Sequence, residues 1–135
     1  MYGPIIFSAY KNTLTDFPLG HYITGFTEFL TNVGGTNCFI LSDGTFITPR
    51  RGVYEFSVSV YHWGEKKNIL AVEKNHVQVI KFQENVDNPL PDLTLTFNWY
   101  MELEKNDKVR LKVVGGNFHC GGDRSNNCIF NGRYI

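Results

Sequence analysis

The chain has 135 residues, and its 13 lysine and arginine residues balance 13 aspartate and glutamate residues, so its formal charge at pH 7 is zero. This length predicts one domain over residues 1–135, and the 42% hydrophobic and 15% aromatic content excludes a disordered chain. A neutral chain lacks the positive excess that general nucleic-acid binding requires, and no apolar run approaches the roughly 18 residues of a membrane-spanning helix. We therefore expect neither nucleic-acid binding nor membrane insertion.

The first half of the chain consists mainly of predicted strands. Residues 4–10 are β-rich, residues 45–48 follow a turn signal, and residues 54–60 alternate apolar with polar side chains. Apolar residues within 26–33 instead have the i, i+3, i+4, i+7 spacing of a short helix, which the glycine pair after them would end. The strand-like segments on both sides weigh against that helix.

The second half continues the β pattern. Residues 68–82 predict a hairpin around a polar centre, and residues 93–103 form the longest clean alternation of apolar and polar side chains. Residues 109–113 and 128–135 alternate in the same way. The polar stretch 104–108 has the composition of a hairpin connection between its two neighbouring strands.

The three cysteines are too few for a disulfide scaffold and lack the CxxC spacing of zinc ligands. Cys38 precedes Phe39 and Ile40, so we expect a small buried hydrophobic side chain there. Cys120 and Cys128 bracket a loop-forming stretch rich in glycine and asparagine. Two alternatives remain open for this pair: a local disulfide that closes the loop, or two unpaired thiols.

Aromatic residues and glycine recur at diagnostic spacings in the middle of the chain. Phe46, Gly52, Tyr54 and Phe56 are separated by five, one and one residues. Upstream, five residues separate Phe26 from Asn32, and six separate Phe39 from Phe46. Further matching segments are residues 6–10, 30–35, 103–111 and 129–132. Taken in order along nearly the whole chain, these motifs resemble the globular head of the complement C1q family, and the Gly-X-Y collagen stalk of many members is absent from this sequence.

The resemblance implies an all-β fold, a two-sheet jelly roll of about ten antiparallel strands shared by C1q heads and tumour necrosis factor relatives. It also implies a compact homotrimer and a secreted protein, although no signal peptide is visible at the N-terminus. Most aromatic residues then belong to the core or a subunit interface, and Phe7, Phe46, Tyr54, Phe56, Trp99 and Phe130 are among them.

Catalytic motifs are missing from the sequence. It contains no His-Glu-x-x-His, Gly-x-Ser-x-Gly, Walker or dinucleotide fingerprint, and its four histidines are scattered. Glu102 and Glu104 lie near the end of a predicted strand, where a solvated rim is a better interpretation than a glycosidase pair. We therefore expect a binding protein and not an enzyme.

Binding is expected in three polar loops between strands. The candidate ligand-binding residues are His62, Trp63, Glu65, Lys66 and Lys67 in the first, Asp87 in the second, and His119, Asp123, Arg124 and Asn126 in the third. An exposed tryptophan can stack on a sugar while nearby charges bind its hydroxyl or acid groups, and Arg124 could pair with a carboxylate or phosphate. The alternatives are that Trp63 caps the core and that the other two loops are plain solvated connections.

Calcium is the one cofactor that the resemblance suggests, because several C1q-like heads hold Ca²⁺ near the third loop. The corresponding oxygen ligands here would be Asp123, Asn126 and Asn127. Calcium takes six to eight oxygen ligands, usually with several carboxylates, and this loop offers a single aspartate. A head without any cofactor is the alternative.

The leading functional hypothesis follows from the resemblance: a secreted, lectin-like homotrimer that recognises microbial glycans or lipopolysaccharide in innate immunity. Its alternative is a signalling or scaffolding ligand that binds a protein receptor, as tumour necrosis factor relatives do. A purely structural trimerisation module is a third hypothesis. The partners expected are thus further copies of the chain, together with glycans or a receptor.

Overall fold

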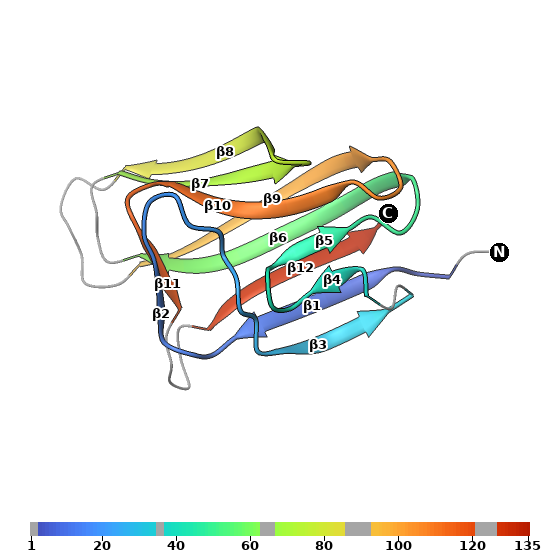
Figure 1. The fold of residues 1–135 in the computed structure, drawn as a ribbon, viewed down its shortest axis with the longest axis horizontal. Helices are drawn as coiled ribbons and strands as arrows, with labels where there is room; N and C mark the ends of the chain where they lie inside the picture. Colours follow the sequence, from blue (N-terminus) through green and yellow to red (C-terminus); the bar gives the residue numbers. More distant parts are fainter. Residues whose placement is uncertain (1–2, 35–36, 63–66, 86–92, 121–126) are drawn as a thin grey trace.

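The computed structural model describes residues 3–34, 37–62, 67–85, 93–120 and 127–135. Two antiparallel sheets lie face to face in it, and the described residues contain strands and turns but no helix (Figure 1). The strands are β1 (Ile6–Lys11), β2 (Thr15–Phe17), β3 (Glu28–Val33), β4 (Phe39–Ile40), β5 (Thr45–Ile47), β6 (Gly52–His62), β7 (Lys67–Lys74), β8 (Val77–Asn85), β9 (Leu93–Leu103), β10 (Lys108–Gly115), β11 (Phe118–Cys120) and β12 (Cys128–Tyr134).

The seven-stranded sheet has the order β2-β11-β6-β12-β1-β3, with β9 on the other edge of β6. The five-stranded sheet has the order β4-β5-β10-β7-β8. Both orders pair strands that are far apart in sequence, as a jelly roll requires. The predicted all-β jelly roll is confirmed.

The core fills the space between the sheets with aromatic rings. Along β6, Tyr54, Phe56, Val58 and Val60 are buried, because successive side chains of a strand point to opposite faces. The Phe56 ring lies 5.3 Å from that of Phe46 and 5.5 Å from that of Trp99. All six aromatic residues predicted for the core or an interface are buried: Phe7, Phe46, Tyr54, Phe56, Trp99 and Phe130. The free thiol Cys38 is buried as well, and burial raises its pKa.

Residues 28–33, whose apolar spacing imitates a helix, form the edge strand β3 and pair with β1. Phe29 packs against Phe39, whereas Leu30 and Val33 are exposed. The four-residue apolar pattern therefore does not mark one buried face. The strands on both sides of this segment therefore predict its structure better than the apolar spacing does.

The polar segment 104–108 does not connect a hairpin, so that prediction is wrong. β9 pairs with β6 in the seven-stranded sheet, while β10 pairs with β5 and β7 in the five-stranded sheet. The segment instead carries the chain from one sheet to the other. The hairpin predicted around residues 73–76 does form, with Asn75 (φ 52°) and His76 (φ 69°) at its turn.

Asp107 ties the crossing segment to that hairpin. Its carboxylate accepts hydrogen bonds from Asn75 Nδ2 at 2.9 Å and from the Glu104 N–H at 2.8 Å, and Lys74 Nζ lies 3.7 Å away. Burial raises the pKa of Asp107, but the hydrogen bonds from Asn75 and Glu104 outweigh this effect and hold it below its usual value. The folded state therefore favours the ionised carboxylate.

Replacing Asp107 by asparagine is expected to cost about 1–2 kcal/mol of unfolding free energy at pH 7. A carboxyl group with a lowered pKa stabilises the fold above its ordinary pKa of about 4 and loses that effect as the pH falls through the folded-state value. The difference between wild type and Asp107→Asn should therefore shrink below about pH 4. Urea unfolding between pH 3 and 7 measures it, with Glu102→Gln at an exposed position as control. A difference that is independent of pH would contradict this account.

Candidate binding surfaces

Most of the predicted ligand-binding residues lie outside the described residues. These are Trp63, Glu65, Lys66, Asp87, Asp123, Arg124 and Asn126. Lys67 is exposed at the start of β7, His62 occupies the last position of β6, and Asn127 is half-buried just before β12. The role of all these residues in binding stays a prediction. The structure describes the strands that flank the three loops.

The strand ends that flank the three predicted loops lie at one end of the sandwich, on the left in Figure 1. His62 at the end of β6 pairs with Leu93 at the start of β9, and Lys67 pairs with Asn85 across β7 and β8. Tyr61 pairs with both Thr94 and His119, which brings β11 to the same place. Three segments that are distant in sequence thus leave the sheets close together.

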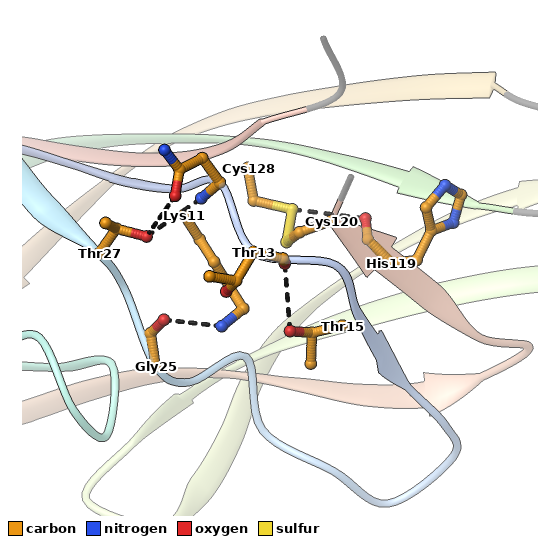
Figure 2. The surroundings of a disulfide bond; sticks show 9 residues. Lys11, Thr13, Thr15, Gly25, Thr27, His119, Cys120 and Cys128 are labelled. Atoms are coloured by element: carbon orange, nitrogen blue, oxygen red, sulfur yellow. Dashed lines mark hydrogen bonds between the residues drawn. A yellow bond between two sulfur atoms is a disulfide. The ribbon is translucent and has the colours of Figure 1, made fainter. Parts of the chain in front are cut away.

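Cys120 and Cys128 form a disulfide across a sequence separation of eight residues, which decides between the two alternatives. Ser59 pairs with Ile129 of β12 and Tyr61 pairs with His119 of β11, so both cysteines fall beside Val60. The segment between them is therefore an insertion in an otherwise continuous line of pairing along β6. The disulfide joins the end of β11 to the start of β12 (Figure 2).

His119 is 1% exposed, which leaves its side chain little surface for a ligand, and its role as a ligand contact stays a prediction. β11 lies between β2 and β6, and all three of its residues are buried. The imidazole packs 6.0 Å from the Tyr61 ring, measured between ring centroids. A strand covered on both faces gives no sign in the sequence when it is only three residues long.

Lys11 is a buried charge that sequence reasoning missed. It pairs with Cys128 across β1 and β12 and is 6% exposed. Its Nζ donates a hydrogen bond of 2.7 Å to the Gly25 carbonyl (Figure 2). The same Nζ lies 5.9 Å from the centroid of the Phe17 ring. Burial lowers the pKa of Lys11. Its side chain therefore links β1 to the segment around Gly25.

A hollow of about 290 Å³ opens on the outer face of the seven-stranded sheet. Polar side chains line it in two hydrogen-bonded rows. Ser8 donates to Asn131, and Asn131 Nδ2 donates to Ser57 Oγ at 3.1 Å. The polar lining residues are Ser8, Thr31, Glu55, Ser57, Asn98, Asn131 and Arg133.

The second row pairs charges. Arg133 Nε donates to Glu55 Oε1 at 2.6 Å, and this bond, followed by one from Tyr100, holds the pKa of Glu55 below its usual range. Around the hollow, apolar side chains on the same face are exposed: Ile6, Val33, Val53 and Tyr100. Exposed apolar side chains that gather on one face are a feature of association surfaces. The sequence shows a polar face on each of these strands, but it does not show that the strands pair and bring the polar faces together.

No three His, Cys, Asp or Glu side chains gather into a metal-binding group within the described ranges. Two of the three predicted calcium ligands, Asp123 and Asn126, lie outside those ranges, so the calcium prediction stays untested. None of the described segments forms a helix long and apolar enough to cross a membrane.

The architecture defines the class of the protein as a jelly roll of the C1q and tumour necrosis factor type. The globular domain of zebrafish complement 1qA matches it with a TM-score of 0.75 at 20% identity, over 97% of both chains. Eiger TNF from S. frugiperda matches with a TM-score of 0.74 at 10% identity, over 98% of this chain and 91% of that one. Murine APRIL matches with a TM-score of 0.68 at 7% identity, over 98% and 100%.

These structural likenesses establish the fold. No curated protein matches the sequence. The model of the C1q domain family matches residues 6–135, and the chain belongs to that family. The predicted resemblance is thereby confirmed.

Proposed function

We propose that the protein acts outside the cell as a homotrimeric, lectin-like binding protein that recognises glycans or lipopolysaccharide of microbial surfaces. One observation carries the proposal: the strand ends flanking all three predicted loops converge at one end of a rigid sandwich. Binding residues in β-sandwich proteins are commonly presented by loops on such a scaffold. Membership of the C1q domain family over residues 6–135 supports the same assignment.

Self-association is part of the proposal. The outer face of the seven-stranded sheet combines a hydrogen-bonded polar hollow with exposed Ile6, Val53 and Tyr100, the last 63% exposed. Exposed apolar side chains grouped on one face support association with a partner through that face. A trimer also repeats each weak sugar site three times, so that binding to a repetitive glycan surface gains avidity.

Within the proposal, Trp63 supplies the stacking surface and Arg124 pairs with acidic groups. Lys66, Lys67 and Asp87 bind hydroxyl and charged groups of the glycan. A calcium ion held by Asp123, Asn126 and Asn127 would belong to the same end of the molecule.

A glycan array probed with protein of established mass tests the proposal. Sedimentation equilibrium at micromolar concentration should give the trimer mass, and the array should show binding that Trp63→Ala and Arg124→Ala weaken. Arg51→Ala is the matched control, since it removes one charge at a side chain that is 71% exposed beside Glu104. A monomer, or an array without binding, would refute the proposal. Saturable binding to one protein receptor without competition by sugars would indicate a receptor ligand instead.

A further inference from the structure

The outer face of the five-stranded sheet carries an aromatic and charged cluster that no predicted loop includes. Residues 20–23 run beside β10: the Gly20 N–H donates to the Val113 carbonyl at 2.8 Å, and the Ile23 N–H donates to the Leu111 carbonyl at 2.9 Å. Tyr22 therefore pairs with Lys112, and β10 brings Arg110 to the same face. We call Tyr22, Glu73, Arg110 and Lys112 the Tyr22 cluster.

The ring of Tyr22 reaches across β10 toward β7. Its hydroxyl donates a hydrogen bond of 2.7 Å to Glu73 Oε1, and this bond raises the pKa of Tyr22. The Arg110 guanidinium carbon lies 3.7 Å from the ring centroid, and Lys112 Nζ lies 5.3 Å from it. The hydrogen bond to Glu73 thus holds the half-buried ring in one orientation, with two cations close to it.

Cations outnumber carboxylates on this part of the face. Glu73 is buried, already accepts the Tyr22 hydrogen bond, and lies 4.0 Å from Lys112 Nζ. Arg110 donates to the Asp43 carbonyl at 3.1 Å, and none of the described carboxylates forms an ion pair with it. Ala71 separates Lys112 from the exposed Lys81 in one cross-strand row. The face therefore has positive charge that the described carboxylates do not neutralise.

We infer that the Tyr22 cluster binds an acidic sugar residue, one that carries a carboxylate or a sulfate group. Stacking on the Tyr22 ring orients the Arg110 guanidinium, whose planar donor geometry suits carboxylate and sulfate oxygens. Lys112 and Lys81 add positive charge on one side of Arg110. The inference rests on the proposed glycan-binding function. It adds a second contact surface, away from the end of the sandwich where the three predicted loops lie.

Titration calorimetry with defined oligosaccharides tests the inference. The probes are a heparin-derived tetrasaccharide for sulfate, a trigalacturonate for carboxylate, and maltotriose as the neutral counterpart. At least one acidic probe should bind, with maltotriose much weaker, and Arg110→Ala and Lys112→Ala should each weaken it about tenfold or more. Tyr22→Ala should weaken it similarly, whereas Tyr22→Phe, which retains the ring, should retain most of the affinity.

Arg51→Ala controls for the loss of one positive charge elsewhere, and thermal unfolding of each variant controls for folding. Equal weakening by Arg51→Ala and Arg110→Ala would overturn the inference, because it would indicate general attraction of polyanions. Loss of acidic-sugar binding in Trp63→Ala and Arg124→Ala, with Arg110→Ala unaffected, would also overturn it while leaving the proposed function intact. A glycan array without any binding would refute both.

Discussion

Phe56→Ala is expected to lower the free energy of unfolding by about 3–5 kcal/mol. The ring is fully buried at the centre of the core, between Phe46 on the five-stranded sheet and Trp99 and Phe130 on neighbouring strands of its own sheet. Its removal leaves a cavity bordered by rigid aromatic rings and strands that belong to continuous sheets. Such walls relax little, so the cost should lie toward the upper part of that range.

Urea unfolding at one fixed protein concentration measures this effect, since association contributes to apparent stability. Val77→Ala at a position that is 63% exposed should change the unfolding free energy by less than about 0.5 kcal/mol. Phe56→Leu retains most of the volume and should fall between the two. A loss below about 1 kcal/mol for Phe56→Ala would show that the aromatic core is loosely packed.

The strands were predictable because their side chains alternate between core and solvent. β6 and β9 show this clearly, with Tyr54, Phe56 and Trp99 on the buried face. Alternation does not encode the pairing partner, however. β9 and β10 each look like half of a hairpin, yet they belong to different sheets, so the role of residues 104–108 was mispredicted.

The candidate surfaces were harder to predict than the strands. Both Lys11 and His119 are buried against residues distant in sequence: Lys11 binds the Gly25 carbonyl, and His119 packs against the Tyr61 ring. The Tyr22 cluster joins residue 22 to β7 and β10 through strand pairing that no local pattern announces. Composition marked the loops as polar, and only the strand register showed that their flanks converge.

The double variant Cys120→Ala/Cys128→Ala is expected to lower the free energy of unfolding by about 2–3 kcal/mol. The disulfide closes a short loop, with a sequence separation of eight residues, and so restricts the unfolded chain. Both sulfur atoms belong to buried side chains, so their loss also removes packing against the core. Chemical denaturation with and without reductant measures the contribution of the disulfide to the free energy of unfolding.

Wild type in reductant should unfold at nearly the same denaturant concentration as the double variant in oxidising buffer, and the double variant should not respond to reductant. Cys38→Ala, which removes a buried thiol without opening a loop, should retain the full response to reductant. The disulfide joins the two ends of the segment that carries Asp123, Arg124 and Asn126. Its loss should therefore also weaken glycan binding, measured at temperatures where the variant is still folded. Unchanged glycan affinity under those conditions would show that the disulfide contributes to stability alone and that these residues bind without it.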